Sequence, residues 1–336
     1  MIVNVPIEPL EERYSQQWGQ WFEKYLKDVK EYVSICPTPM TDTVREGAFL
    51  DVVGTVHYKS EQISQICQLI DDKIIPRNRR VVFLFHDGWF PIEQLAYIRD
   101  LLECWDWKFV GIFHDGTYDK HDLLARKKLY TWGESLENSW FKIYDKVIVG
   151  SNYHKQVLLE ERRIQEHKIA VIPWHVDVGT YKPVKKEKLI VFPHRLDKEK
   201  RPGVFRKLME EVCHFPTEFS FRYEVTQDAH RTKDEYYKIL AKAQISVSTA
   251  VLEMFGIAMV ESVLLGCLPL VPDRLAYREM YPACFRYQDE QDMRWKLATM
   301  MRNPEEFRAQ LTLLQATFAG NSRRFFPALM EVLSTI

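Results

Sequence analysis

The 336-residue sequence lacks the glycine motifs of the common nucleotide-binding folds. Its 13 glycines include no Gly-x-Gly and no Gly-Lys-Ser/Thr, which excludes the dinucleotide fingerprint and the P-loop. Asp-x-Asp, a common metal-binding pair of carboxylates, is also absent. A diphosphate bound by this chain would therefore need cationic side chains or a helix N-terminus in place of these motifs.

Paired cysteines, a signal peptide and long apolar runs are missing as well. The six cysteines are scattered without a Cys-x-x-Cys pair, and no basic start is followed by an apolar stretch. These features favour a reducing, cytoplasmic setting. No apolar run approaches the roughly 20 residues of a membrane span. The formal net charge of −1 argues against a general affinity for nucleic acid, but it allows a local basic patch.

The central feature is the stretch Glu-Met-Phe-Gly-Ile-Ala-Met-Val-Glu from Glu253 to Glu261. Residues 245–249 before it predict a strand, and residues 257–265 predict a buried helix because they are apolar on nearly every side. The helix carries Glu261 into the interior, where a carboxylate needs a partner. Either a buried salt bridge satisfies it, or both glutamates accept hydroxyl groups of a ligand whose anionic part lies at Gly256.

This Glu-x7-Glu pattern resembles the signature of the retaining, family 4-like glycosyltransferases with the GT-B fold. The resemblance implies an α/β architecture of two Rossmann-like domains that face a central cleft, with parallel sheets flanked by helices. It implies that Glu253 contacts the donor sugar and that Glu261 binds the ribose hydroxyls of the nucleotide. The backbone of Phe255, Gly256 and Ile257 would then bind the donor diphosphate.

A second match to the family follows the strand predicted over residues 189–192. Arg195 and Lys200 have the spacing of the family's arginine and lysine, which implies that both bind the diphosphate. The resemblance implies no metal ion and no cofactor besides the sugar nucleotide, with a UDP-sugar favoured. Pro193-His194 replaces the family's usual glycine, as in the tRNA-queuosine mannosyltransferase group, which this half of the chain resembles.

Two further apolar runs, residues 81–85 and 109–113, are each followed directly by His-Asp-Gly. They predict parallel strands covered on both faces, whose carboxyl ends point toward a ligand. A capping aspartate beside a buried histidine explains either pair alone. The resemblance, however, places the second histidine against the donor sugar. The expected catalytic residues are therefore His114, Glu253, Arg195 and Lys200.

The acceptor side has weaker signals. After a strand predicted over residues 1–5, the chain has prolines and charged residues where relatives carry glycines, so the family's acceptor contacts cannot be transferred. Acidic residues at a helix start explain part of this segment equally well. The acceptor-side candidates are Glu8, Glu11, Arg13, His86, Asp87 and Asp115.

The resemblance extends over nearly the whole chain and predicts its division. The first, acceptor-side domain is expected over residues 1–178, together with a crossing helix over 318–336. A linker over 179–188 then leads to the nucleotide-sugar domain, residues 189–317. Between residues 223 and 245 there is space for only one helix, so this second domain should be smaller than in most relatives.

The implied reaction is transfer of a hexose or pentose from a nucleoside diphosphate to an acceptor hydroxyl with retention. The opening residues resemble phage glycosyltransferases that modify hydroxymethylated pyrimidines such as hydroxymethylcytosine in DNA, which would act in the host cytoplasm. The acceptor could instead be tRNA, a polysaccharide or a lipid-linked molecule. An epimerase of the same fold would turn over the donor without an acceptor, and a non-catalytic GT-B scaffold subunit would lack donor-site residues.

Local basic clusters and aromatic residues support a nucleic-acid acceptor, since they could follow phosphates and stack on bases. Ordinary solvated charges and core aromatics explain the same residues. The clusters are Arg77, Arg79 and Arg80; Arg126, Lys127 and Lys128; and Arg162 and Arg163. The aromatic residues expected at the surface are Trp89, Phe90, Tyr118 and Trp132.

Overall fold

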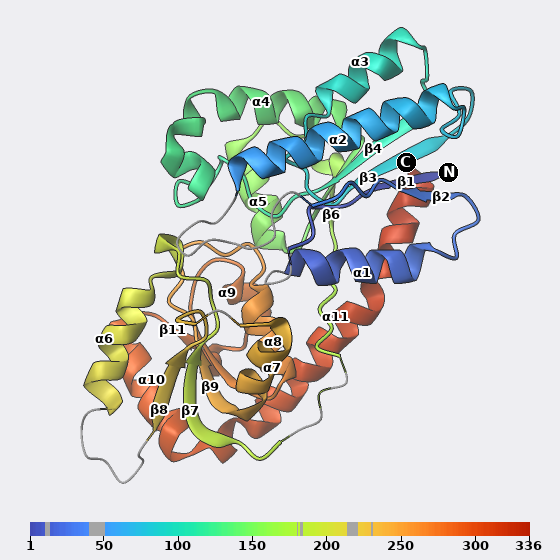
Figure 1. Cartoon of the computed structure of the whole chain (residues 1–336). Coiled ribbons are helices and arrows are strands. Elements are labelled where there is room, and N and C mark those ends of the chain that lie inside the picture. The colour runs from blue at the N-terminus through green and yellow to red at the C-terminus, as the bar shows by residue number, and fades with distance from the viewer. Residues whose placement is uncertain (11–13, 40–50, 180, 182–183, 214–220, 230) are drawn as a thin grey trace. The chain divides into compact units, whose positions relative to one another are not determined.

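The computed structural model describes residues 1–10, 14–39, 51–179, 181, 184–213, 221–229 and 231–336. They form two compact units, coloured along the chain in Figure 1. Unit 1 consists of Met1–Gly150, His154–Ile172 and Phe326–Ile336, and unit 2 of Ser151–Tyr153 and Pro173–Phe325. The predicted linker, residues 179–188, falls within unit 2 in this division.

Unit 1 contains a six-stranded sheet in the order β2-β1-β3-β4-β5-β6, and every pair of neighbours is parallel. The inner strands β3 and β4 are almost entirely buried because their sequences are continuous apolar runs. The strands are β1 (Ile2–Val5), β2 (Tyr32–Ser34), β3 (Val81–Phe85), β4 (Trp107–Ile112), β5 (Lys146–Val149) and β6 (Ile169–Val171).

Helices cover both faces of this sheet. In Figure 1, α2, α3 and α4 lie on one side, and α1 lies on the other with the end of α11. Tyr25 of α1 stacks on Phe326 of α11 with 4.0 Å between ring centroids, which fastens the end of the chain to unit 1. The helices are α1 (Tyr14–Leu26), α2 (Val52–Asp71), α3 (Glu93–Leu101), η1 (Ala125–Leu129), α4 (Tyr130–Ile143), α5 (Asn152–Glu161), η2 (Glu166–Lys168) and α11 (Arg308–Thr335).

Unit 2 contains a five-stranded parallel sheet in the order β11-β10-β9-β7-β8. Helix α7 packs against α8, and α6 against α10. The strands are β7 (Glu187–Phe192), β8 (Arg222–Val225), β9 (Ala243–Val247), β10 (Leu268–Pro272) and β11 (Arg286–Tyr287). The helices are η3 (Lys198–Lys200), α6 (Pro202–Cys213), α7 (Lys233–Lys242), α8 (Ile257–Leu264), α9 (Tyr277–Met280), η4 (Ala283–Phe285), α10 (Glu290–Arg302) and η5 (Pro304–Phe307).

Most elements predicted from apolar runs are present, with ends shifted by a few residues. Between β8 and β9 the described residues contain one helix, α7, as the short spacing predicted. The last helix differs most, because it begins at Arg308 and not at residue 318, and it continues through Pro327. Within the described part of the chain, no helix combines the length and apolar character that crossing a bilayer requires.

Candidate functional site

The centre of the predicted donor site is the turn that leads into α8. Gly256 precedes this helix with φ +86°, a left-handed conformation that side chains other than glycine rarely adopt. The first amide groups of a helix lack intrahelical partners and carry partial positive charge. Phe255 beside this turn is buried, and its ring lies 6.0 Å from that of Trp174.

Glu253 and Lys200 meet in front of this turn. The Lys200 ammonium group lies 3.0 Å from the carboxylate of Glu253 and donates a 2.8 Å hydrogen bond to the carbonyl of Leu252. The Tyr277 hydroxyl donates to the same Glu253 oxygen at 3.3 Å. Lys200 is only 7% exposed, and these oxygen atoms are the partners that a buried ammonium group requires. The structure therefore brings together two residues that the sequence placed in one site.

Arg195 lies at the carboxyl end of β7 and is bracketed by two carboxylates. Its guanidinium group lies 2.6 Å from Asp197 and 2.6 Å from Glu199, which is itself buried. Neighbouring His194 is also buried, and its pKa lies well below the ordinary value because of burial and the charges of Lys200 and Arg195. His194 is therefore uncharged at neutral pH.

Glu261 has the buried partner that its position on an apolar helix requires. Its carboxylate lies 2.6 Å from the ammonium group of Lys233 and accepts a 2.8 Å hydrogen bond from the hydroxyl of Tyr237. The buried salt bridge is thus present. The Lys233 ammonium group also lies 4.9 Å from the centre of the Tyr237 ring. Whether Glu261 also binds a ribose, as the resemblance implies, stays a prediction.

Sequence analysis missed the residues that hold the predicted ones in place. Those of Glu253 and Glu261 come from other elements of unit 2, whereas those of Arg195 follow it by two and four residues in the sequence. They are Asp197 and Glu199 for Arg195, Tyr277 for Glu253, and Lys233 and Tyr237 for Glu261. Burial of a carboxylate in an apolar helix was the only usable signal, and it predicted a partner without identifying it.

Gly256 provides a test of the donor site. A Cβ atom there would lie 3.0 Å from the Tyr277 ring and 3.3 Å from Cγ of Glu253. Gly179 also has positive φ, +71°, but a Cβ there meets nothing within 4 Å. We expect Gly256→Ala and Gly179→Ala each to lower the free energy of unfolding by about 1 kcal/mol. Only Gly256→Ala should also weaken UDP binding, measured by calorimetry, and equal UDP affinities would contradict the prediction.

In unit 1 the two predicted histidines lie close together at the ends of β3 and β4. His114 donates through Nε2 to the backbone carbonyl of His86 at 2.8 Å, and His86 donates through Nε2 to Oδ1 of Asn4 at 2.6 Å. Trp18 and Phe22 of α1 pack against these imidazole rings. Burial lowers the pKa of His86 to about 3 and that of His114 below its ordinary value. Both rings are therefore uncharged at neutral pH.

The carboxylates predicted on the acceptor side have structural partners. Asp87 lies 2.7 Å from the ammonium group of Lys59, and Asp115 accepts a 2.9 Å hydrogen bond from the amide of Gly116. Glu8 is buried and accepts a 3.3 Å hydrogen bond from the hydroxyl of Thr55. These contacts fit the simpler explanation of capping and paired carboxylates. The remaining predicted contacts of this group, Glu11 and Arg13, lie outside the described residues.

A buried carboxylate joins the loops that follow β3 and β4. Glu137 of α4 is fully buried, and its Oε1 accepts hydrogen bonds from the Thr117 amide at 2.7 Å and from Nε1 of Trp89 at 3.0 Å. Its Oε2 accepts from the Thr117 hydroxyl at 2.8 Å and pairs with Arg162 at 2.6 Å. Glu137 thus holds in place the two His-Asp-Gly loops, although sequence analysis did not identify it.

Buried, uncharged histidines predict acid sensitivity. Burial lowers the pKa of His86 and of His154 from 6.5 to about 3. Unfolding therefore takes up a proton at each site below pH 6.5, so stability is present above that pH and is lost as pH falls. We expect each histidine to lower the free energy of unfolding by about 1.4 kcal/mol per pH unit from pH 6 to 5.

Matched variants separate this effect from general acid denaturation. His154→Gln should reduce the slope of unfolding free energy against pH by about 1.4 kcal/mol per unit. The matched control is His167→Gln, which changes an exposed histidine of unit 1. Denaturant titrations at several pH values measure both, and identical slopes for the two variants would show that His154 does not titrate as described.

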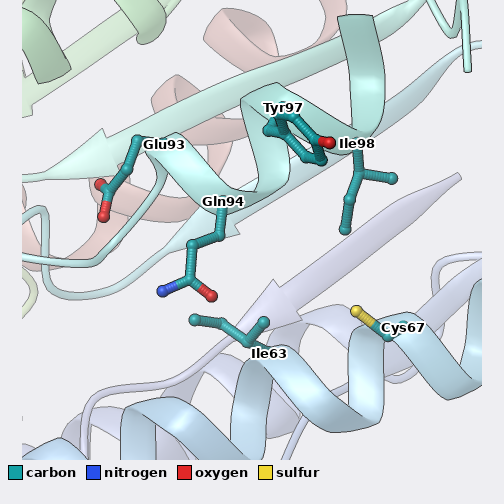
Figure 2. A pocket seen from close by; sticks show the side chains of 6 residues that line it. All are labelled: Ile63, Cys67, Glu93, Gln94, Tyr97 and Ile98. Atoms are coloured by element: carbon teal, nitrogen blue, oxygen red, sulfur yellow. The ribbon is translucent and has the colours of Figure 1, made fainter. Parts of the chain in front are cut away.

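Unit 1 also has an apolar surface pocket. It lies between α2 and α3, where Gln94 and Ile98 point toward Ile63 and Cys67 (Figure 2). Glu93 and Tyr97 complete the lining, which contains none of the predicted site residues. Among the described residues, no group of three or more His, Cys, Asp or Glu side chains is arranged to hold a metal ion.

Comparisons with known proteins place this geometry in context. No protein-family model matches the chain. The chain is 26% identical over 292 residues to the tRNA-queuosine alpha-mannosyltransferase of Drosophila melanogaster, a match that covers 71% of this chain and 76% of that protein. The sucrose-phosphate synthase of Thermosynechococcus elongatus superposes with a TM-score of 0.71 at 11% identity, over 100% of this chain and 99% of that one.

The catalytic domain of starch synthase IV from Arabidopsis thaliana, bound to ADP and acarbose, superposes with a TM-score of 0.67. It is 10% identical, and the match covers 99% of each chain. Similarity at this level of identity shows the fold. The chain therefore has the GT-B fold over its whole length, which confirms the predicted α/β class with two parallel sheets flanked by helices.

Proposed function

We propose that this protein is a glycosyltransferase that moves a sugar from a nucleoside diphosphate sugar to a hydroxyl group on a modified base of a nucleic acid. The observation that carries the proposal is the pairing of Lys200 with Glu253 beside the left-handed turn at Gly256. Arg195 lies at the end of the neighbouring strand β7. Two cations, a carboxylate that would bind the donor sugar and a helix N-terminus are thus combined in unit 2.

The donor diphosphate would bind to the positive groups of this site. Lys200 and Arg195 now contact Glu253, Asp197 and Glu199, so binding of a diphosphate would exchange part of these ion pairs for contacts with phosphate oxygens. The amide groups at the start of α8 would add their partial charge. The proposal needs no metal ion, because these groups supply the positive charge.

In the proposed reaction, the bond between the sugar and the diphosphate breaks while the acceptor oxygen bonds to the same face of the sugar. The leaving phosphate takes the proton of the acceptor hydroxyl, so no separate base is needed. Arg195, Lys200 and the α8 N-terminus stabilise the charge that develops on the leaving group. Glu253 would bind sugar hydroxyls, as its present contacts with Lys200 and the Tyr277 hydroxyl suit an acceptor of hydrogen bonds.

Two lines of support favour a nucleic-acid acceptor. The fly relative is named for action on tRNA queuosine, and it matches 71% of this chain. The opening residues resemble phage enzymes that modify hydroxymethylated pyrimidines in DNA. Both acceptors present a hydroxyl group on a modified base, so we propose this chemical class and leave the choice between tRNA and DNA to experiment.

Transfer of radiolabelled sugar tests the proposal. UDP-glucose, UDP-arabinose and GDP-mannose would be incubated with hydroxymethylcytosine DNA, unmodified DNA and tRNA, using wild type, Glu253→Ala and the control Glu210→Ala, whose side chain is exposed on α6. We expect label in one nucleic acid, lost only in Glu253→Ala. Hydrolysis of the donor without labelling of any nucleic acid would indicate that the acceptor is a glycan or a lipid. Neither hydrolysis nor labelling would contradict the proposal and favour a non-catalytic GT-B protein.

A further inference from the structure

Three basic clusters stand out in the sequence of unit 1, and their contacts in the structure differ. In the cluster before β3, Arg79 pairs with Glu31 at 2.6 Å and Arg77 lies 3.7 Å from Asp71. Arg80 donates hydrogen bonds of 2.9 and 3.0 Å to two carbonyls at the end of α11. These three arginines are exposed, but each has a carboxylate or carbonyl partner within the protein.

The cluster after α5 and most of the aromatic residues contribute to the interior. Arg162 is 9% exposed and pairs with buried Glu137. Phe90 and Tyr118 are 2% and 6% exposed, and Trp89 is half-buried with its indole nitrogen donating to Glu137. The prediction that these aromatic residues lie at the surface was therefore wrong. They pack in the core because they flank the buried strands and the Glu137 network.

The cluster before α4 is different, since cations and aromatic rings are exposed together. Arg126, Lys127 and Lys128 are exposed, and Tyr130 and Trp132 after them are 60% and 52% exposed. Among the described residues, no carboxylate lies within ion-pair distance of Lys127 or Lys128. We call residues 126–132 the basic-aromatic segment.

The backbone of this segment is strained. Lys128 has φ 65° and ψ 10°, a left-handed conformation that is uncommon for a side chain other than glycine. The non-helical angles of Lys127 and Lys128 kink the chain between η1 and α4. Lys73, Glu103, Arg201 and Leu275 also have positive φ, so this conformation alone does not mark the segment as functional.

We propose that the basic-aromatic segment binds a single-stranded part of the nucleic-acid acceptor, an inference that rests on the proposed glycosyltransferase function. Lys127 and Lys128 contact phosphates, and Tyr130 and Trp132 stack on unpaired bases. Exposed aromatic rings beside cations are the usual means of holding single strands, because every base has a face on which a ring stacks. The segment thus adds a binding surface on unit 1 that shares no residue with the predicted donor site.

An anionic membrane surface is the alternative partner for cations and aromatic rings. Membrane-seated helices insert aliphatic and aromatic side chains along one face. Between Asp106 and Gly179 the exposed large hydrophobic side chains are Tyr130 and Trp132 alone, and neither is aliphatic. Two residues apart on a helix, they lie roughly 200° apart around its axis, so one flat surface does not receive both. A flexible single strand can contact both.

The test is binding of the full chain to a fluorescent single-stranded DNA oligonucleotide and to tRNA, measured by anisotropy at several salt concentrations. We expect Lys127→Ala with Lys128→Ala to reduce the slope of log affinity against log salt by about 1.4, because each phosphate contact on a single strand contributes about 0.7. Trp132→Ala should weaken binding by about fivefold or more.

Matched controls carry the same chemical changes elsewhere. Lys27→Ala with Lys30→Ala removes two exposed lysines of unit 1, and Trp105→Ala removes a tryptophan that is 62% exposed. Neither control should alter binding. UDP affinity, measured on every variant, should stay at the wild-type value, because the segment contains none of the predicted donor-site residues.

The outcomes separate this inference from the function on which it rests. If the segment variants and the controls bound nucleic acid equally well, the proposed role of the segment would be wrong, but the transferase proposal would stand. Wild-type protein that binds anionic phosphatidylglycerol vesicles through these residues, but no nucleic acid, would overturn both the segment's partner and the acceptor class. Loss of nucleic-acid binding in the segment variants alone would support the inference.

Discussion

Replacing Lys200 with alanine is expected to lower the rate of sugar transfer by about 100- to 1,000-fold, because one preorganised charge at the leaving group is removed. The ammonium group is buried between the Leu252 carbonyl and the Glu253 carboxylate, so water cannot replace it without rearrangement. The change also leaves Glu253 without its cation. Donor turnover with the acceptor that the labelling experiment identifies, measured under single-turnover conditions, gives the rate.

Lys198→Ala is the matched control for this prediction. Lys198 belongs to the same short helix η3, but its side chain is exposed. An exposed charge of this kind contributes little, so we expect transfer within about twofold of wild type. Thermal unfolding of both variants shows whether the fold is retained. If the rate of sugar transfer fell equally in the two variants, or in neither, the assignment of Lys200 to the donor site would be wrong.

The second large effect is expected on stability, from Glu137→Ala. This change leaves Arg162 buried without its carboxylate and removes the acceptor for Thr117 and Trp89. Breaking one side of a buried ion pair typically costs about 3–5 kcal/mol. We expect a clear fall in the melting temperature of unit 1, together with faster hydrogen exchange at the Thr117 amide.

Two variants sharpen this prediction. Glu134→Ala changes an exposed glutamate on the same helix, and it should alter stability by less than about 0.5 kcal/mol. Glu137→Gln keeps the size and one acceptor oxygen but places an amide against the Arg162 guanidinium, so it should also destabilise. If Glu137→Ala lowered the stability no more than Glu134→Ala, the hydrogen bonds of Glu137 would not be needed to hold the two loops in place.

Much of the secondary structure was predictable because its signals are local. Strand β3 has the predicted bounds, Val81–Phe85, since a short continuous apolar run bounded by polar segments predicts a strand covered on both faces. Helix α8 was predicted from a longer stretch, because its residues would be apolar on nearly every side of a helix. The crossing helix expected over residues 318–336 is the end of a longer helix, α11, which begins at Arg308 and contains Pro327.

Side-chain environment was harder to predict, because it depends on residues far away in the sequence. Phe90 and Tyr118 looked like Trp132 in the sequence, yet they are buried and Trp132 is exposed. The sequence suggested that Arg162 and Lys128 were both solvent-exposed charges. Lys128 is exposed, but Arg162 is buried against Glu137. Burial is set by which elements pack above a residue, and local composition carries no information about that packing.

In the candidate donor site, too, local sequence signals and tertiary packing determined different features. The sequence alone determined that a strand, a glycine turn and a buried helix carry Glu253 and Glu261, because apolar periodicity and a conformationally free glycine are local properties. Only the tertiary structure decided which groups neutralise these carboxylates. Lys200, Lys233 and Tyr237 reach them from other elements, and a buried charge takes its partner from whichever element the fold places beside it.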